Sequence, residues 1–179
     1  KKINNSNQSF KNITLRYFNP IGAHPTGLIG ELPIGNPENL VPYMTQTAIG
    51  KRDFLSVFGD NYKTKDGTCI RDYINIMDLA EVHIACLEKL IAVEDENFFK
   101  IYNVGTGKGT SVFELINLFE NVNDIKLNYK IGDRRKGDVI SAYADTTKIK
   151  EELSWSTKYS LENALKSAWN WELNLNKDE

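Results

Sequence analysis

The chain has 179 residues, of which 41% are hydrophobic and 26% charged, and its formal net charge is −2. These values are typical of an ordinary soluble globular protein and exclude a general attraction to nucleic acid or to membrane surfaces. No apolar run approaches the ~20 residues needed to cross a bilayer. Two cysteines, Cys69 and Cys86, make no disulfide framework, and we expect Cys86 to be a buried thiol on a helix. We therefore expect a cytoplasmic protein without nucleic-acid or membrane partners.

The amino-terminal third combines a polar start with short elements and one long loop. Residues 1–12 are polar and Asn-rich, which predicts a flexible segment. Residues 13–18 are rich in β-forming side chains and are closed by an Asn-Pro pair, which predicts a strand. Four glycines and three prolines between residues 22 and 37 predict a long loop. A helix is expected over 39–49, followed by a short strand over 55–58.

The middle of the chain predicts a strand, a helix and a second strand. Residues 70–74 form the first strand. Asp78 is the predicted N-cap of the helix, with Glu81 placed to complete a capping box. The apolar residues of this helix recur at helical spacing, at Leu79, Val82, Ala85, Cys86 and Leu90. After an acidic linker, residues 99–104 predict another strand.

The carboxy-terminal part adds two helices and one strand. Ser111 and Glu114 form a capping box that predicts a helix through Phe119. Alternating apolar residues over 125–131 indicate a half-buried strand. A last helix is expected to begin at Ser160. Strands that alternate with helices in this way indicate an α/β protein.

Several familiar signatures are missing from the sequence. The glycines of residues 105–110 complete neither G-x-G-x-x-G nor a P-loop, so a tight strand-to-helix turn is the better interpretation. None of the eight tyrosines is followed by a lysine four residues later. No cluster of His, Cys and carboxylates has metal-ligand spacing. We therefore predict no metal site and no short-chain-dehydrogenase Tyr/Lys pair in this chain.

Three polar features together suit a diphosphate. Asn39 precedes a helix start, where backbone N–H groups favour anions, although a simple N-cap is the alternative. Arg71 lies between apolar strand residues and points into a site or pairs with Asp72. The run 134–138 places cations beside a glycine and a carboxylate, although such runs are often solvated. Two arginines and a helix start could each contribute ~1.5–3 kcal/mol per charged hydrogen bond, with Asp138 accepting from ribose hydroxyls.

Six short motifs follow one another along the chain in a characteristic order and spacing. The most specific is the run L-R-Y-F-N-P-I-G-A-H-P-T-G at residues 15–27. The others are I-G-E at 29–31, N-L-V-P-Y at 39–43, D-G-T at 66–68, R-D-Y at 71–73 and R-R-K-G-D at 134–138. From Ile13 to about Trp171 the chain thereby resembles the UDP-glucose/UDP-galactose 4-epimerase family of extended short-chain dehydrogenase/reductases.

The resemblance implies the carboxy-terminal part of such an α/β enzyme. This part would contain the last strands and helices of a Rossmann sheet and a smaller, mixed α/β substrate-binding domain. Segments 13–22 and 69–106 would join the Rossmann sheet, and segments 23–68 and 107–175 would form the substrate-binding domain. The amino-terminal, NAD-binding half would not be part of this chain.

The resemblance also implies the binding residues. Tyr17 and Pro20 would lie beside the nicotinamide of NAD, and Asn19 would contact the sugar. The remaining contacts to UDP would come from Asn39, Arg71 and Arg135 at the diphosphate, from Asp138 at the ribose, and from Leu40, Leu55, Ser56 and Phe58 around the uracil.

Two positions depart from the family pattern. Asn75 stands where the family usually has histidine. Ala142 stands where members confined to unacetylated sugars have a bulky aromatic residue, whereas small residues accompany acceptance of N-acetylhexosamines. Alanine would widen the sugar pocket, so we expect the complete enzyme to accept UDP-GlcNAc and UDP-GalNAc as well.

The implied activity is interconversion of UDP-galactose and UDP-glucose by NAD-dependent transient oxidation at C4. Because this chain has no Tyr-x-x-x-Lys pair, it carries no catalytic residue, and we expect it to be inactive without its amino-terminal half. A complete enzyme would form a homodimer. Two alternatives stay open: a noncatalytic UDP-sugar-binding module, and another sugar-nucleotide short-chain reductase or decarboxylase.

Overall fold

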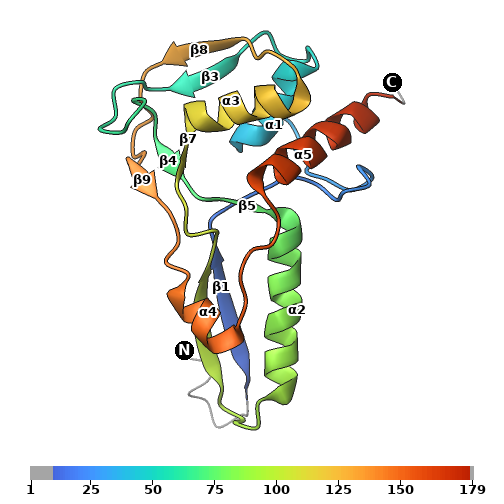
Figure 1. Cartoon of the computed structure of the whole chain (residues 1–179), viewed down its shortest axis with the longest axis vertical. Coiled ribbons are helices and arrows are strands. Elements are labelled where there is room, and N and C mark those ends of the chain that lie inside the picture. Colours follow the sequence, from blue (N-terminus) through green and yellow to red (C-terminus); the bar gives the residue numbers. More distant parts are fainter. Residues whose placement is uncertain (1–9, 178–179) are drawn as a thin grey trace.

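Residues 10–177 are described by the computed structural model, and they form two groups of elements stacked along the long axis (Figure 1). Residues 1–9 of the predicted flexible start lie outside the described residues. The strands are β1 (Asn12–Tyr17), β2 (Asn19–Ile21), β3 (Leu55–Phe58), β4 (Ile70–Arg71), β5 (Tyr73–Asn75), β6 (Phe99–Val104), β7 (Thr110–Ser111), β8 (Tyr129–Gly132) and β9 (Ser141–Ala142). The helices are α1 (Leu40–Ala48), α2 (Ile76–Ala92), α3 (Val112–Asn123), α4 (Thr147–Leu153) and α5 (Leu161–Leu175).

Two consecutive parallel strand pairs, β1 with β6 and β2 with β5, link the two groups of elements. β1 pairs in parallel with β6 over its whole length, and β2 pairs in parallel with β5. The change of partner occurs around Phe18, whose N–H donates to the Val104 carbonyl, while the Asn19 N–H donates to the Asp72 carbonyl. Asn19 is thereby in register with Tyr73.

Two further small sheets lie toward the end of the molecule that is away from β1 and β6 (Figure 1). β3 and β8 pair in parallel. β4 lies between β7, which is antiparallel to it, and β9, which is parallel to it. In this sheet Arg71 is in register with Ala142. The pairing brings two segments that are distant in sequence side by side, and it positions one wall of the pocket described below.

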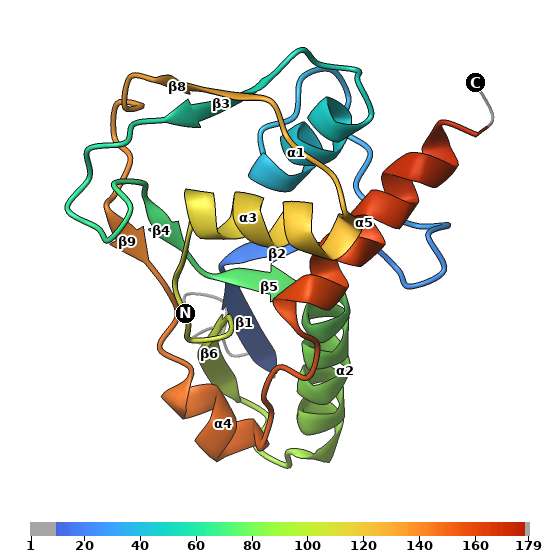
Figure 2. The ribbon, with the colours of Figure 1, turned by 45° about the horizontal axis from the view of Figure 1, so that its top comes forward.

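Two apolar cores hold these groups together, and Figure 2 shows α3 and α5 above β2 and β5, with α2 and α4 below. The first core lies among α1, α3, α5 and β3, and its buried members include Val41, Met44, Leu55, Val57, Leu115, Phe119 and Leu165. The second lies among β6, α2 and α4, and its buried members include Ile74, Val82, Cys86, Tyr102, Val104, Ile149 and Trp155. Burial of such side chains contributes ~1.5–3 kcal/mol each.

Most sequence predictions of secondary structure are confirmed. The strands β1, β3 and β6 and the helices α1, α3 and α5 lie within one to four residues of the expected ranges. The capping box of α3 forms, with the Glu114 N–H donating to the Ser111 hydroxyl and the Ser111 N–H donating to the Glu114 carboxylate. Cys86 is 6% exposed, so the expected burial of its thiol is confirmed.

The predicted start of α2 is wrong. The helix begins three residues earlier than expected, and Asn75 is its N-cap, with a side-chain oxygen that accepts from the Met77 N–H at 2.9 Å. Asp78 is buried and instead accepts from the backbone N–H groups of Lys158 and Tyr159. The carboxylate that looked like a cap is therefore a tertiary anchor, and Asn75, the departure from the family pattern, supplies the cap.

The strand predicted over 125–131 is confirmed only at its end, where β8 begins at Tyr129, and the expected half-burial of that strand is wrong. Regular pairing is confined to β8, and every residue of β8 is exposed. The apolar residues before it do reach the first core, since Leu127 is buried there and Ile125 packs against it. The alternating apolar residues Ile125 and Leu127 therefore belong to an irregular segment that packs against the core, not to a strand. The short helix α4 was not predicted, because only Ile149 of its seven residues is buried and no apolar stripe forms.

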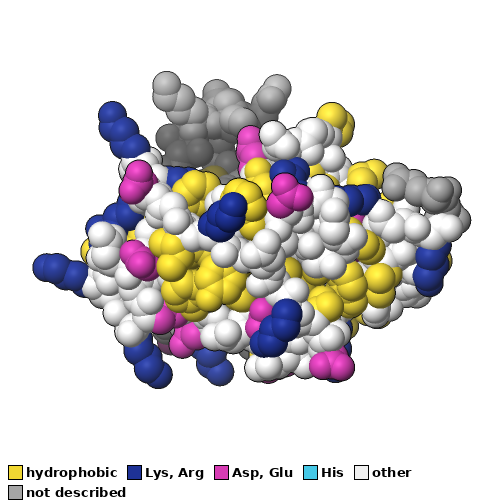
Figure 3. All heavy atoms as spheres, turned by 90° about the horizontal axis from the view of Figure 1, so that it is seen from above, with side chains coloured by type: hydrophobic (Ala, Val, Ile, Leu, Met, Phe, Trp, Pro, Cys, Tyr) yellow, Lys and Arg dark blue, Asp and Glu magenta, His cyan; other side chains and the backbone are white. Residues whose placement is uncertain are grey.

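Exposed apolar side chains remain on the surface, and Figure 3 shows patches of them on the face seen from above, among lysines and arginines. Four lie in the loop before α1, at Leu28, Ile29, Leu32 and Ile34. In the part of the chain that the structure describes, no helix is both long enough and apolar enough to span a membrane.

Candidate functional site

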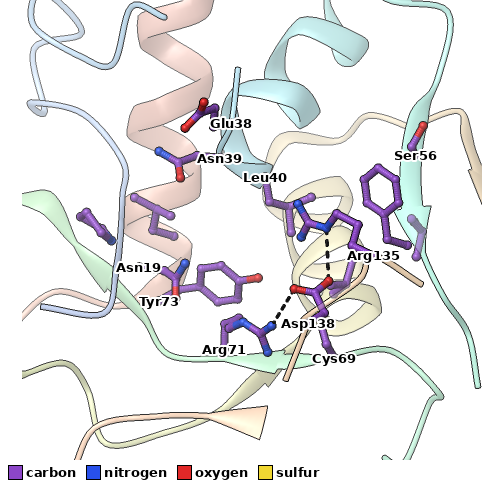
Figure 4. Close-up of a pocket in the computed structure, with 15 residues that line it drawn as sticks. Asn19, Glu38, Asn39, Leu40, Ser56, Cys69, Arg71, Tyr73, Arg135 and Asp138 are labelled. Atoms are coloured by element: carbon purple, nitrogen blue, oxygen red, sulfur yellow. Dashed lines mark hydrogen bonds and ion pairs between the residues drawn. The ribbon is translucent and has the colours of Figure 1, made fainter. Parts of the chain in front are cut away.

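A pocket of about 110 Å³ opens between the start of α1, the carboxyl ends of β2 and β3, and the segment before β9 (Figure 4). Its charged and polar lining residues come from five separate parts of the sequence. The lining consists of Asn19, Pro20, Ile21, Glu38, Asn39, Leu40, Ser56, Val57, Phe58, Cys69, Arg71, Tyr73, Val112, Arg135 and Asp138.

One carboxylate in this pocket bridges two guanidinium groups. Asp138 Oδ1 lies 3.3 Å from Arg71 Nη2, and Asp138 Oδ2 lies 3.2 Å from Arg135 Nε. The dashed lines in Figure 4 join the three side chains into one chain of charges. The pair of Arg71 with Asp72, which was the alternative suggested by the sequence, does not form. The three side chains together carry a charge of +1, and the carboxylate of Glu38, which also lines the pocket, balances it. An anionic ligand would therefore be held by direct contacts to the two guanidinium groups and not by a net positive charge of the pocket.

The two arginines differ in how firmly they are held. The side chain of Arg71 is 17% exposed, and its Nη1 also donates to the carbonyls of Ile70 and Val139, at 2.8 Å in each case. The side chain of Arg135 is 55% exposed, and its guanidinium carbon lies 4.8 Å from the centroid of the Phe58 ring. Arg71 is therefore held by several contacts inside the pocket, whereas Arg135 is a more exposed cation at its mouth, held by one carboxylate and one ring.

The start of α1 faces the same pocket. Asn39 has extended backbone geometry at the N-cap position, but its side chain makes no capping hydrogen bond. Instead its amide donates to the Glu31 carboxylate at 2.8 Å. The first turn of α1 is therefore not closed by its own N-cap side chain, and the positive end of the helix is directed at the pocket that Arg71 also lines.

A larger and more apolar pocket of about 520 Å³ adjoins the first one. The two share the walls formed by Glu38, Leu40, Ser56, Phe58 and Arg135. The walls of the second pocket are completed by Pro37, Tyr43 and Leu55. A flat heterocycle would fit against its apolar surface while a charged group attached to it reached the arginines.

Alternation along the extended chain places two further side chains, Cys69 and Tyr73, on the same side as Arg71. Cys69 directly precedes β4 and Tyr73 begins β5, so the three residues lie at every second position, and all three line the pocket. Burial raises the pKa of the Cys69 thiol, and burial also raises the pKa of the Tyr73 phenol. Both groups are therefore neutral near pH 7. In Figure 4 the Tyr73 hydroxyl points toward Arg71 and Asp138.

The arrangement can therefore bind an anion next to a flat apolar group, as a nucleoside diphosphate requires. Within residues 10–177 no group of three or more His, Cys, Asp or Glu side chains could hold a metal ion. Comparison with known protein families indicates which class of enzyme has such a site. A sequence model described as GDP-mannose 4,6 dehydratase matches residues 6–168.

The chain belongs to the GDP-mannose 4,6 dehydratase family.

Within this family the similarity is to 4-epimerases. The chain is 47% identical over 171 residues to UDP-glucose 4-epimerase 1 of Oryza sativa subsp. japonica, an alignment that covers 96% of this chain and 48% of the relative. Its structure matches the UDP-glucose-4-epimerase of Stenotrophomonas maltophila, solved with bound NAD and formylated UDP-arabinopyranose. That match has a TM-score of 0.94 and 39% identity, and it covers 99% of this chain and 52% of that chain.

A third relative differs in the sugars named for it. The UDP-Glc/GlcNAc 4-epimerase of Campylobacter jejuni matches with a TM-score of 0.74 and 38% identity, over 92% of this chain and 49% of that chain. The chain thus spans about half the length of the relatives it matches. The mixed α/β fold is that of an extended short-chain dehydrogenase/reductase, and its extent fits the carboxy-terminal part of such an enzyme.

Most of the residues singled out in the sequence come together in the two pockets. Nine line the first: Asn19, Pro20, Asn39, Leu40, Ser56, Phe58, Arg71, Arg135 and Asp138. Leu55 lines the second. Tyr17 and Ala142 line neither pocket. Tyr17 is 53% exposed, and its ring centroid lies 6.4 Å from that of His83, while Ala142 lies beside Arg71 in the sheet of β4 and β9.

Three residues that line the pocket, Cys69, Tyr73 and Glu38, were not predicted as site residues from the sequence. Tyr73 and Cys69 were not singled out, although their spacing of two from Arg71 on a predicted strand was a usable signal. Glu38, which lines both pockets, directly precedes Asn39. No local pattern distinguishes it from an ordinary residue before a helix.

Proposed function

We propose that this chain is the UDP-sugar-binding half of a UDP-glucose 4-epimerase. The complete enzyme would interconvert UDP-galactose and UDP-glucose through NAD-dependent transient oxidation at C4 of the sugar. The observation that carries the proposal is the carboxylate of Asp138 between two guanidinium groups, at the start of α1 and beside an apolar pocket. The guanidinium groups and the start of α1 suit a diphosphate, the carboxylate suits a ribose, and the apolar pocket suits a uracil.

The diphosphate would lie between Arg71, Arg135 and the start of α1 at Asn39. Each charged hydrogen bond there would contribute roughly 1.5–3 kcal/mol. Binding would require Arg135 to exchange part of its contact with Asp138 for phosphate oxygens, which its 55% exposed side chain permits. The Asp138 carboxylate, once released from Arg135, would accept hydrogen bonds from the ribose hydroxyls.

The uracil would occupy the larger pocket, against Leu40, Leu55, Ser56 and Phe58. The apolar walls favour a flat base, and the Ser56 hydroxyl would give it a polar contact. The hexose would extend the other way, toward Asn19 and Ala142. Asn19 lines the pocket at the start of β2, where its amide could hold a sugar hydroxyl in position.

NAD, when bound, would supply the hydride acceptor at C4, and Tyr17 and Pro20 of this chain would flank its nicotinamide. The fit is partial. Tyr17 presents an exposed ring at the end of β1, and Pro20 lies three residues further on, in β2, where it lines the pocket. These residues offer one wall of a nicotinamide site. The sequence contains neither a glycine-rich pyrophosphate loop nor a Tyr-x-x-x-Lys pair.

The remaining elements would come from a polypeptide that supplies the amino-terminal half. The outer side of α2 supports this partner, because Ile84, Leu87 and Ile91 are 59%, 57% and 75% exposed and follow one helical stripe. We also propose that the complete enzyme forms a homodimer and is cytoplasmic. The division into Rossmann segments 13–22 and 69–106 and substrate-binding segments 23–68 and 107–175 belongs to the same proposal.

Two measurements test the function. Calorimetric titration of the chain with UDP should give saturable binding, and an absence of binding would contradict the proposal. The chain alone should not convert UDP-galactose to UDP-glucose, whereas a mixture with a polypeptide that supplies the amino-terminal half and NAD should. Turnover to a dehydrated or decarboxylated sugar nucleotide would instead identify another short-chain reductase, and UDP binding without any reconstituted activity would identify a noncatalytic binding module.

A further inference from the structure

The carboxylate of Asp72 is the acceptor for a complete cage of backbone and hydroxyl donors. Its side chain lies between β4 and β5 and is 0% exposed. Oδ1 accepts from the Thr106 N–H at 2.9 Å and from the Thr106 hydroxyl at 2.6 Å. Oδ2 accepts from the N–H groups of Gly107 and Ala144, at 3.0 and 3.1 Å. Donors from two distant segments therefore meet at one side chain.

The Asp72 carboxylate is held by hydrogen-bond donors and not by a positively charged side chain. Across residues 10–177 no Lys, Arg or His forms an ion pair with Asp72, so the four donors alone compensate its burial. Burying an unpaired carboxylate is costly unless several N–H or O–H groups donate to it. Gly105 keeps the cage tight, because a Cβ at that position would overlap Asp72 Oδ2. A side chain at Gly105 would therefore displace the Asp72 carboxylate or Ala144.

The cage and the neighbouring arginine hold the same segment at two points. Arg71 donates to the Val139 carbonyl and pairs with Asp138, and it is in register with Ala142. Asp72 then holds the Ala144 N–H, two residues further on. Residues 138–144 are thus held by two consecutive side chains, Arg71 at the end of β4 and Asp72 directly after it, which point to opposite sides of the extended chain.

We propose that Asp72 is a positioning residue of the nucleotide-sugar site. It touches no ligand itself. It fixes residues 138–144 and the turn at 105–107 so that Asp138, Arg71 and Ala142 keep the spacing that a diphosphate and a hexose require. This inference rests on the proposed function for its ligand, whereas the rigidity of the segment can be measured without one.

The test replaces Asp72 by Asn, which keeps the shape but presents an NH₂ group to a cage of donors. Hydrogen–deuterium exchange should become about tenfold faster in peptides covering 105–110 and 138–144, and it should be unchanged in α5, because only the local cage is weakened. In calorimetry, the affinity of D72N for UDP should fall about tenfold, and its affinity for uridine should fall by a smaller factor, because uridine uses the ribose contact to Asp138 but makes no diphosphate contact to Arg71.

A second pair of variants keeps the inference testable if D72N does not fold. Thr106→Val removes one donor hydroxyl and should show the same pattern more weakly, whereas Thr106→Ser keeps the hydroxyl and should behave like the unaltered chain. Unchanged exchange in 138–144, or equal losses of UDP and uridine binding, would overturn the inference. If the unaltered chain bound neither ligand, the proposed function would fall, and the exchange data would still decide whether Asp72 fixes the segment.

Discussion

The Arg71 guanidinium and the Asp138 carboxylate, 67 residues apart in sequence, lie 3.3 Å apart in the pocket, and each side chain is only 17% exposed. The pair depends on the sheet of β4 and β9, which brings the two chain segments into register. Because Asp138 also binds Arg135, one carboxylate sets the position of both cations. The geometry makes Arg71 the residue whose loss should matter most for the diphosphate.

Replacement of Arg71 by Ala should lower the affinity for UDP by about 10- to 100-fold, because a partly buried cation and its two carbonyl contacts are lost together. Arg71→Lys should not restore the affinity, since a lysine cannot donate to Asp138, Ile70 and Val139 in the same planar arrangement. Calorimetry with UDP measures both. Lys126→Ala is a matched control, because Lys126 pairs with Glu120 on the surface and is 85% exposed. A loss as large in that control would contradict the assignment.

Arg135 should contribute mainly a salt-sensitive attraction, because its side chain is 55% exposed at the pocket mouth. Arg135→Ala should weaken UDP binding about 3- to 10-fold at low salt and flatten its salt dependence, since screening acts on exposed charges. Titration at roughly 50 and 500 mM salt provides the measurement.

Arg134→Ala is the control for Arg135. Arg134 is the preceding cation, but it donates to Asn61 and its guanidinium carbon lies 4.0 Å from the centroid of the Tyr62 ring. UDP affinity of this variant should stay within about twofold of the original, because the contacts of Arg134 lie outside the pocket. An equal effect of the two substitutions would mean that general positive charge, and not the position of Arg135, attracts the ligand.

Ala142 should determine which sugars the complete enzyme accepts. Ala142→Tyr should reduce kcat/KM for UDP-GlcNAc and UDP-GalNAc more than about tenfold and retain turnover of UDP-galactose, because a bulky ring fills the space that an N-acetyl group needs. Ala142→Ser, a small residue, should behave like the original. Steady-state kinetics on the enzyme reconstituted with its amino-terminal half checks this. The hypothesis fails if the unaltered enzyme ignores both acetylated substrates.

The two cysteines should differ in their response to ligand. Cys69 and Cys86 are each 6% exposed, and burial raises the pKa of both thiols. A raised pKa keeps each thiol protonated to higher pH, so alkylation should be slow at neutral pH and accelerate above the ordinary thiol pKa of about 8.5. UDP should slow alkylation of Cys69, which lines the pocket, and leave Cys86 unaffected. Peptide mass spectrometry after iodoacetamide treatment at several pH values measures both rates.

The same shifts have a consequence for stability. A thiol whose pKa is raised by folding contributes stability that is fully present below the pKa of the unfolded chain and is lost as the pH rises through the folded value. The free energy of unfolding should therefore decline as the pH rises above the ordinary thiol range. If Cys69→Ser and Cys86→Ser together removed none of this decline, the shifts would not be its cause.

The sequence alone determined the types of most elements and the chemistry of the pocket. Caps and periodicity act over a few residues, so the box at Ser111 and Glu114 and the strand β3 could be predicted from local sequence. The cations, the carboxylate and the helix start that suit a diphosphate were likewise visible as residue types. The family motifs then indicated their roles, which the experiments above test.

Tertiary structure alone decided which of these groups meet. Asp78 looked like a helix cap, but the segment at Lys158 and Tyr159 takes its carboxylate, because a buried anion needs N–H donors wherever the fold provides them. Likewise, no local rule distinguishes the neighbours Arg71 and Asp72. Strand alternation sends one side chain to the pocket and the other into a cage of distant donors, and only the pairing of β4 with β9 brings Asp138 to the first and Ala144 to the second.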